Sequence, residues 1–369
     1  MKVVADKFLY RIEETLPGDV ELIPFDPENG LPENVTSADA LLVRTVTKIN
    51  ADTLPEAGKL KFIGTATAGF DHVDIDHLES LGIAFGHSPG CNARAVAEYV
   101  ITAIYLWAEK HAEKPENGGV TVGVVGCGHT GSAVIELLRK LGIRYLQYDP
   151  PRAERDSGFE TVSADELMSA DILTFHVPLT RSGKHATHHL CNASWLKNGV
   201  RLIINAARGG VVDEQALVEA LKQNLIGEAI TDVWENEPVF SDEMAAHSMI
   251  ATPHIAGYSR ESKLRASRLV IEEMCRVLRL EPVGQLPGEH YDKTLIIDPD
   301  MVFAGFLRKN NQIDIYDRDL RKLIGLPGKE KGRLFAKLRA ETPTRFEYRS
   351  ILKAAINRND IPEPCKVFL

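Results

Sequence analysis

Short apolar runs alternate with polar connecting segments through the first quarter of the chain. Residues 2–5, 20–23, 40–43, 61–64 and 83–85 each form such a run. Runs of this length, separated by segments long enough for a crossover, are typical of parallel strands in a small α/β domain. We therefore expect one such domain near the N-terminus.

A second series of apolar runs follows a long apolar helix expected over 95–107 and a breaker segment at 114–119. The predicted strands of this series are 120–125, 143–148, 172–175, 201–204, 229–231 and 249–251. A helical pattern over 214–221 separates two of them. This order predicts a doubly wound parallel sheet of the Rossmann type.

The pattern changes again after a helix expected over 260–278. Pro282, Gly284 and Pro287 then predict a linker. Beyond it, apolar side chains recur at helical spacing: Leu320, Leu323, Ile324, Leu334, Phe335 and Leu338. A short segment offers them little partner surface, so we expect an apolar face that a second copy of the chain covers, which would make a homodimer.

The glycine-rich stretch after the 120–125 run is the clearest chemical signal. Gly126 would allow a tight turn, Gly128 a close approach to a pyrophosphate, and Gly131 close packing of the next helix. The backbone N–H groups at the start of that helix, at His129 and Thr130, would bind the anion. The sequence thus predicts a dinucleotide site.

Asp149 ends the next predicted strand, at the spacing of a carboxylate that accepts hydrogen bonds from the adenosine ribose. This favours NAD over NADP as the cofactor. Arg152, three residues later, leaves NADP as an alternative.

Composition excludes several classes of protein. The net charge of −9 over 369 residues argues against broad nucleic-acid binding, although residues 286–369 hold 16 Lys and Arg against 12 Asp and Glu. The run 99–108 is too short to span a membrane, and the N-terminus lacks the apolar core of a leader. Five scattered cysteines without a CxxC pair indicate a reducing compartment, so we expect a cytoplasmic protein with no membrane and no nucleic-acid partner.

Three polar segments follow predicted strands at their carboxyl ends, where open α/β sheets bind ligands: 205–213, 232–238 and 252–258. They contain Arg208, Glu237 and His254. Hydride transfer from a 2-hydroxy acid needs a base for the hydroxyl proton and a cation for the carboxylate, and these side chains can supply both.

In their order, spacing and context, the three segments, the Gly126 loop and Asp149 resemble the D-isomer-specific 2-hydroxyacid dehydrogenase superfamily. The resemblance implies a flavodoxin-like substrate domain, a Rossmann domain and a small α+β dimerisation domain, with boundaries at 1–94 plus 257–285, 95–256, and 286–369. It also implies roles. His254 would take the C2 hydroxyl proton, Glu237 would orient its ring, and Arg208 would bind the substrate carboxylate beside the cofactor.

The same resemblance extends to residues around these three. Asp232 would accept from the nicotinamide carboxamide, and the remaining cofactor contacts would come from Thr174, Ala206, Ala207 and Gly257. The hydroxyls expected near the substrate are Thr45, Thr67 and Tyr258, and the candidate cations for a substrate phosphate are Arg44, Lys48 and Arg94.

The resemblance extends to stretches at 43–48, 64–69, 89–93, 319–322 and 325–328, and it implies a branch of the superfamily that acts on phosphorylated acids. The expected reaction is NAD-dependent oxidation of 4-phospho-D-erythronate at C2, in the synthesis of pyridoxal phosphate. Oxidation of 3-phospho-D-glycerate is one alternative. A non-catalytic NAD-sensing protein on the same fold is another, although it would need neither a base nor a carboxylate clamp.

Two other features invite a chemical interpretation. Lys184, His185, His188 and His189 form a cluster, but no neighbouring Cys or carboxylate in the sequence completes a coordination set, so no metal site is predicted. Cys91 follows Pro-Gly, yet hydride transfer needs no thiol nucleophile. We expect Cys91 to be a small buried residue.

Overall fold

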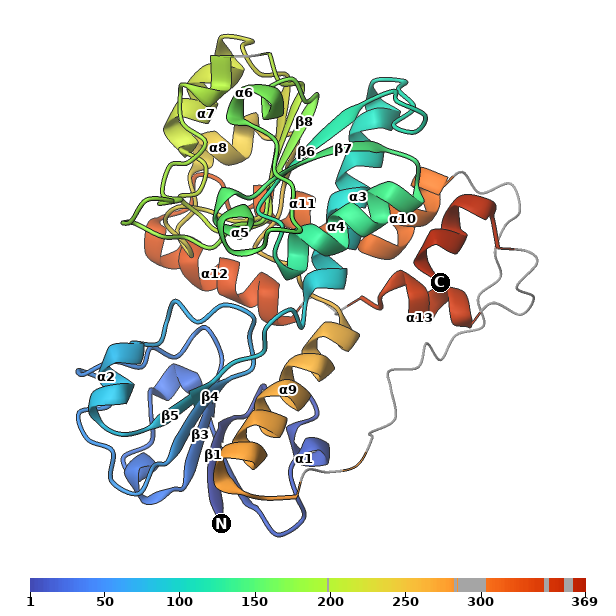
Figure 1. Cartoon of the computed structure of the whole chain (residues 1–369). Helices are drawn as coiled ribbons and strands as arrows, with labels where there is room; N and C mark the ends of the chain where they lie inside the picture. The colour runs from blue at the N-terminus through green and yellow to red at the C-terminus, as the bar shows by residue number, and fades with distance from the viewer. Residues whose placement is uncertain (198, 282–283, 285–302, 342–344, 355–360) are drawn as a thin grey trace. The chain divides into compact units, whose positions relative to one another are not determined.

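The computed structural model describes residues 1–197, 199–281, 284, 303–341, 345–354 and 361–369 (Figure 1). The chain forms two compact units. The first contains residues 1–92 and 259–290, and the second contains residues 93–258 and 291–369.

The first unit is built on a five-stranded parallel sheet. Its strands are β1 (Lys2–Asp6), β2 (Glu21–Phe25), β3 (Ala40–Val43), β4 (Phe62–Thr65) and β5 (Ala84–Gly86). They lie in the order β2-β1-β3-β4-β5, which is the flavodoxin-like order. All five predicted strands are therefore confirmed, each to within a few residues.

Alternate strand residues of this sheet face two separate cores. Val4, Leu41 and Ile63 pack on one face, and Val3, Leu42 and Phe62 pack on the other with helix α9 (Arg260–Leu278). The helix lies so close to the sheet that a Cβ on Gly64 would come within 2.5 Å of Val270 Cγ2. The short elements around the sheet are α1 (Ile12–Thr15), α2 (Ile75–Ser80), η1 (Pro27–Asn29) and η2 (Val35–Ser37).

The second unit contains a six-stranded parallel sheet. The strands are β6 (Thr121–Val125), β7 (Arg144–Tyr148), β8 (Ile172–Phe175), β9 (Leu202–Asn205), β10 (Glu228–Thr231) and β11 (Ile250–Ala251), in the order β11-β10-β9-β8-β6-β7. The chain builds outward from β6 to β7 on one side and then from β8 on the other. The switch point lies between β6 and β8, where doubly wound folds bind their ligands.

Helices cover both faces of this sheet (Figure 1). Helices α3 (Ala93–Lys110) and α4 (His129–Lys140) share one core with Val122, Val124 and Ile204, whereas Leu173, Phe175 and Ile203 point into the other core. The remaining elements between the strands are α5 (Pro150–Arg155), α6 (Ala164–Leu167), η3 (Trp195–Lys197), α7 (Glu214–Lys222) and α8 (Asp242–His247).

The C-terminal segment packs against the same two cores. Its described elements are α10 (Phe303–Asn311), α11 (Ile313–Arg321), α12 (Gly328–Glu341), α13 (Tyr348–Lys353) and η5 (Glu363–Phe368). Phe306, Leu307 and Phe368 join the α3 core, and Leu320 and Phe335, both fully buried, join the other.

This packing corrects the expectation of an uncovered apolar face after residue 285. The stripe is covered by the chain's own second unit, because Leu320 and Phe335 pack into the core that also contains Trp234 and Phe240. The described residues of the segment form helices and no strand, so the β part of the expected α+β domain is not found among them.

Arg321 fixes α11 to the edge of the sheet. Its guanidinium donates to the carbonyl oxygens of Ala245 at 2.7 Å and Ser248 at 2.8 Å. It also pairs with Asp317, whose carboxylate accepts from the N–H of Ala251 in β11 at 2.7 Å. One backbone N–H of the edge strand β11 is thus satisfied by a helix that begins more than sixty residues later.

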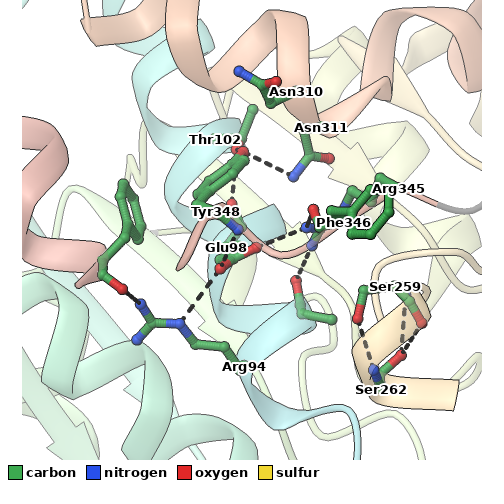
Figure 2. A network of polar contacts seen from close by, with 12 residues as sticks. Arg94, Glu98, Thr102, Ser259, Ser262, Asn310, Asn311, Arg345, Phe346 and Tyr348 are labelled. Atoms are coloured by element: carbon green, nitrogen blue, oxygen red, sulfur yellow. Dashed lines mark hydrogen bonds and ion pairs between the residues drawn. The ribbon is translucent and has the colours of Figure 1, made fainter. Parts of the chain in front are cut away.

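A buried ion pair fixes the end of the chain to α3 (Figure 2). Glu98 is fully buried, and its Oε2 accepts from Arg345 Nη1 at 2.7 Å. Its Oε1 accepts from the N–H of Tyr348 at 3.0 Å, and the Tyr348 hydroxyl lies 2.6 Å from Thr102 Oγ1. Burial raises the pKa of Glu98 to about 7, and the charge of Arg345 opposes that rise.

All five cysteines are unpaired and buried. Burial raises the pKa of the Cys91 thiol to about 11, so this thiol stays protonated at neutral pH, as a small buried residue would. Within the described ranges, no helix combines the length and the apolarity needed to cross a membrane.

We expect Arg345→Met to lower the free energy of unfolding by about 3–5 kcal/mol at pH 8, because it removes the buried partner of the Glu98 carboxylate and leaves only the longer contact to half-buried Arg94, at 3.4 Å. Because the pKa of Glu98 is raised to about 7, this carboxyl is protonated and uncharged in the folded protein at pH 5. The destabilisation caused by Arg345→Met should therefore be smaller at pH 5 than at pH 8. Urea unfolding at both pH values measures this. Arg333→Met on the exposed side of α12 is the control, and an equal loss at pH 5 and pH 8 would contradict the argument.

Candidate active site

The glycine-rich loop joins β6 to α4 at the switch point. Gly126 has φ +86°, and a Cβ there would lie 2.6 Å from Val177 Cγ1. A Cβ on Gly131 would lie 1.9 Å from the carbonyl oxygen of Gly126, so only glycine permits this close approach. A Cβ on Gly128 would meet nothing within 4 Å, and no side chain caps the helix that follows. The loop therefore leaves room for a phosphate at the start of α4, beside His129 and Thr130.

Asp149 lies beside this loop, at the end of β7. Its Oδ2 accepts from the N–H of Cys127 at 2.8 Å, and its Oδ1 accepts from the N–H of Arg152 at 3.0 Å, which caps α5. A carboxylate has about four acceptor positions, so Asp149 can still accept from a ribose diol. Arg152 donates to the carbonyl oxygen of Cys127 at 2.6 Å and stacks over the Phe159 ring at 4.2 Å.

Arg208 lies on the loop after β9, and hydrogen bonds and close packing fix the conformation of this loop. Asn205 accepts from the N–H of Ala207 at 3.2 Å and donates to the carbonyl oxygen of Arg208 at 3.2 Å. A Cβ on Gly209 would lie 1.8 Å from the carbonyl oxygen of Trp234, so the loop packs directly on the segment that carries Glu237. The Arg208 side chain is half-buried and donates to the Ala207 carbonyl oxygen at 2.8 Å.

Asp232 follows β10 and is almost fully buried. Its carboxylate accepts from Thr252 Oγ1 at 2.6 Å and from the N–H groups of Ile255 and Ala256 at 2.8 and 2.9 Å. Burial raises the pKa of Asp232 above its ordinary value, while these hydrogen bonds and the His254 charge oppose the rise. The residue expected to contact the cofactor therefore also organises the His254 segment.

His254 lies in the turn that Asp232 holds. Its backbone has φ +58°, a left-handed conformation that is uncommon for residues other than glycine, and its N–H donates to the Asp232 carbonyl oxygen at 2.7 Å. Its ring Nδ1 lies 2.7 Å from Oε2 of Glu237. The other carboxylate oxygen of Glu237 accepts from the N–H of Trp234 at 3.0 Å.

This pairing has the chemistry of a general base. Burial alone would raise the pKa of Glu237, but the charges of His254 and Arg339 and the hydrogen bond to His254 lower it below its ordinary value. Glu237 is thus ionised at neutral pH and accepts the proton of His254 Nδ1. The other ring nitrogen, Nε2, then carries the lone pair that can take a proton from a hydroxyl.

Tyr258 is the one predicted substrate hydroxyl that belongs to the same unit as His254. Its N–H donates to the Ile255 carbonyl oxygen at 2.8 Å, which continues the turn after His254. The guanidinium of Arg339 lies 5.6 Å from the centre of its ring. Arg339 belongs to α12, and no pattern in the sequence distinguishes it from the other basic residues of the tail.

The other substrate candidates lie apart from these residues in the sequence, and Arg44, Thr67 and Arg94 make polar contacts of their own. In the first unit, Arg44 donates to the buried carboxylate of Asp6 at 2.8 and 3.2 Å, and Thr67 Oγ1 donates to the Gly69 carbonyl oxygen at 2.7 Å. Thr45 and Lys48 are exposed there. In the second unit, Arg94 pairs with Glu98 and donates to the Phe368 carbonyl oxygen at 3.1 Å.

The remaining cofactor candidates lie at or just beyond the carboxyl ends of the strands. Thr174 is fully buried in β8, and its hydroxyl lies 3.0 Å from His176 Nε2. Ala206 and Ala207 follow β9 directly, and Gly257 follows the turn at His254. Burial lowers the pKa of His176 to about 3, so this ring is neutral next to the switch point.

The histidine cluster needs one correction. The sequence suggested no carboxylate near it, but the fold brings two beside His189: Glu235 Oε1 lies 3.0 Å from Nε2, and Asp213 Oδ2 lies 3.6 Å from Nδ1. These three side chains could hold a metal ion by position alone. The 3.0 Å separation is a hydrogen-bond distance, and Lys184 and His185 instead pair with Glu154.

Comparison with known proteins identifies the family of this chain. Residues 93–256 match the family described as the NAD binding domain of D-isomer specific 2-hydroxyacid dehydrogenases. Erythronate-4-phosphate dehydrogenase of Bacteroides fragilis is 36% identical, with 94% of this chain and 97% of that protein covered. The corresponding protein of Proteus mirabilis is 40% identical, with 95% and 94% covered.

A solved structure gives the same result for the fold. NAD+-bound 3-phosphoglycerate dehydrogenase from Entamoeba histolytica superposes with a TM-score of 0.59 at 25% identity, covering 76% of this chain and 95% of that one. The likeness to the erythronate-4-phosphate dehydrogenases extends over nearly the whole length of both chains. This chain therefore belongs to the erythronate-4-phosphate dehydrogenase branch of the D-isomer specific 2-hydroxyacid dehydrogenase family.

Proposed function

We propose that the protein oxidises 4-phospho-D-erythronate at C2 to the corresponding 2-oxo acid, with NAD as the acceptor. The observation that carries the proposal is the 2.7 Å contact between His254 Nδ1 and Glu237 in a segment that follows a sheet strand. A general base of this kind is what oxidation of a hydroxyl requires. The names of the nearly full-length relatives support the choice of substrate.

In the proposed reaction, the chain's residues bind the acid and move one proton. Arg208 binds the substrate carboxylate with its planar guanidinium and polarises the C2 oxygen. His254 Nε2 takes the C2 hydroxyl proton, and the ionised carboxylate of Glu237 stabilises the imidazolium that forms. The hydride that leaves C2 would pass to bound NAD, which would supply the two-electron acceptor.

The cofactor would be held by the loop at β6 and by Asp149. Open space at Gly128 and the uncapped start of α4 fit a pyrophosphate, and the Asp149 carboxylate fits an adenosine ribose. Asp232, Thr174, Ala206, Ala207 and Gly257 would line the nicotinamide half. Tyr258, Thr45 and Thr67 would contact the substrate, with Arg44, Lys48 and Arg94 as candidate phosphate cations.

Oxidation of 3-phospho-D-glycerate is the alternative reaction, because both acids join a 2-hydroxy carboxylate to a phosphate. An assay of the purified protein with both acids, following NADH absorbance, separates them. A clear preference for 4-phospho-D-erythronate is expected. A preference for 3-phospho-D-glycerate would overturn the substrate assignment, and NADH binding without turnover of either acid would favour the non-catalytic alternative.

We infer a cytoplasmic enzyme, because all five cysteines are unpaired thiols, as a reducing compartment would keep them.

We expect His254→Ala to lower kcat by about 10²- to 10⁴-fold, because the C2 hydroxyl loses its base. NADH affinity, measured by fluorescence titration, should stay within about threefold, since the ring is not proposed to hold the cofactor. His247→Ala, on the exposed end of α8, is the matched control and should keep wild-type turnover. Full turnover in His254→Ala would remove this assignment.

Asp149→Ser should narrow or invert the preference for NAD over NADP, because the carboxylate that repels a 2′-phosphate is gone. Serine is chosen because it can still cap α5. The ratio of kcat/KM with the two cofactors is the measurement, and Asp165→Ser on exposed α6 is the control. Equal use of both cofactors by the wild-type protein would contradict the role given to Asp149.

We also propose that the protein is a homodimer. The apolar stripe of the C-terminal segment packs against the second unit and so is not available for a dimer interface. An interface on this segment would instead use the exposed apolar side chains Ile315 and Leu369. Static light scattering at micromolar concentration should give twice the 40.8 kDa chain mass. A monomer under these conditions would refute the proposal.

A further inference from the structure

Two oppositely charged side chains bind the backbone of the same residue in the glycine-rich loop. Asp149 Oδ2 accepts from the N–H of Cys127 at 2.8 Å, and Arg152 Nη1 donates to the carbonyl oxygen of Cys127 at 2.6 Å. Asp149 also caps α5, because its Oδ1 accepts from the N–H of Arg152 at 3.0 Å. The carboxylate expected at the adenosine ribose therefore has a cation as its neighbour.

The Arg152 guanidinium is fixed in place by contacts that leave its charge largely uncompensated. It lies over the Phe159 ring at 4.2 Å, and its Nη1 lies 3.4 Å from Ser132 Oγ. Its ion-pair partner is Asp156, at 3.7 Å from Nε, and the Asp156 side chain is 51% exposed, so this pair is weak.

Arg152 also has donors to spare. Within the described part of the chain, its Nη2 has no hydrogen-bond partner, and its side chain is 36% exposed, so a ligand can reach it. The cation is thus held by the loop that is expected to bind the dinucleotide, with part of its fork unused.

We propose that Arg152 is a specificity-determining residue for the cofactor: it is already placed to bind a 2′-phosphate, and the Asp149 carboxylate opposes that binding. The preference for NAD is then a balance of two opposed charges and not the effect of Asp149 alone. The inference rests on the proposed contact between Asp149 and the adenosine ribose. It adds that removal of one carboxylate lets the chain bind NADP through a residue that it already has.

The two forms of the ribose make different demands on these side chains. A carboxylate accepts from both hydroxyls of an unmodified ribose, but it repels a 2′-phosphate, which carries up to two negative charges. A guanidinium has only donors, so it binds a phosphate much more strongly than a neutral hydroxyl. One charge-assisted hydrogen bond of this kind changes affinity by about tenfold to a hundredfold.

A purely structural role for Arg152 is the competing explanation. In that case Arg152 would only tie α5 to the glycine-rich loop through the Cys127 carbonyl oxygen. Its loss would disturb the loop and weaken NADH and NADPH alike, because both place the same pyrophosphate there. The ratio of the two affinities therefore separates the explanations, whereas stability does not.

The test measures the Kd of NADH and of NADPH by fluorescence titration for the wild-type protein, Asp149→Ser, Arg152→Gln and the double variant. We expect Asp149→Ser to bind NADPH about tenfold or more tightly than the wild-type protein does. In the double variant this gain should fall to about threefold or less, because the phosphate has lost its cation. The Kd of NADH should differ by less than about threefold between Asp149→Ser and the double variant.

Two comparisons sharpen the test. Arg155→Gln is the matched control, since it changes an exposed arginine of the same helix whose Nε donates to the Pro151 carbonyl oxygen at 3.0 Å, and it should leave both Kd values unchanged. Adenosine 2′,5′-bisphosphate and adenosine 5′-monophosphate, used as competitors of NADH, should show the same pattern as NADPH and NADH. That result would confine the effect to the adenosine half of the cofactor.

With Asp149→Ser, Arg152→Lys should keep part of the gain for NADPH, because an ammonium retains the charge and loses the fork. A double variant that retains the full gain, or an Asp149→Ser variant that shows none, would overturn the inference. Equal loss of NADH and NADPH affinity in Arg152→Gln would establish the structural role. These measurements read binding alone, so a protein that binds NADH and oxidises neither phosphorylated acid fails the proposed function, while the ratio of affinities still decides this inference.

Discussion

The buried carboxylate of Asp232 is the interaction on which the candidate site depends. It accepts three hydrogen bonds from residues 252–256, and the Thr252 hydroxyl that donates one of them lies 2.8 Å from the Tyr99 hydroxyl of α3. These bonds hold the chain in a left-handed turn at His254, from which the ring reaches Glu237. A carboxylate can organise such a turn because it accepts from several donors at once, whereas an amide or hydroxyl could satisfy fewer of them. The geometry of the base is therefore set by a residue one layer away from it.

The C-terminal segment is joined to this arrangement through contacts of one buried and two half-buried arginines, and not through apolar packing alone. Arg321 satisfies the edge of the sheet next to β11, Arg345 pairs with Glu98 on α3, and Arg339 reaches Tyr258. A charge is costly when it is buried without a partner, so these contacts favour one position of the C-terminal segment against the sheet. Leu320 and Phe335 bury apolar surface in the core of the second unit, and the three arginines favour one position of the segment along that core.

Two carboxyl groups of the second unit, Glu237 and Glu98, have pKa values that are shifted in opposite directions. Glu237 is kept ionised by cations despite its burial, which suits a group that must stabilise an imidazolium. Glu98 is buried more completely, and its pKa is raised to about 7 although it has an arginine partner. The difference follows from burial, since two cations act on each carboxyl but Glu98 is fully buried, whereas the Glu237 side chain is 23% exposed. The tertiary position of these two carboxyls thus decides the direction in which each pKa is shifted.

The sequence by itself determined the two parallel sheets, the glycine loop with Asp149, and the three strand-end segments that carry Arg208, Glu237 and His254. These features are local: apolar runs, glycine spacing and the position of a polar residue after a strand are all written within short stretches of chain. Tertiary structure decided what local patterns do not contain. It placed Glu235 and Asp213 beside His189, turned the apolar stripe of the tail onto its own core, and brought Arg339 to Tyr258. Each of these joins residues more than twenty positions apart, and a partner at such a distance leaves no periodicity in the sequence, because only the packing of whole elements brings the two together.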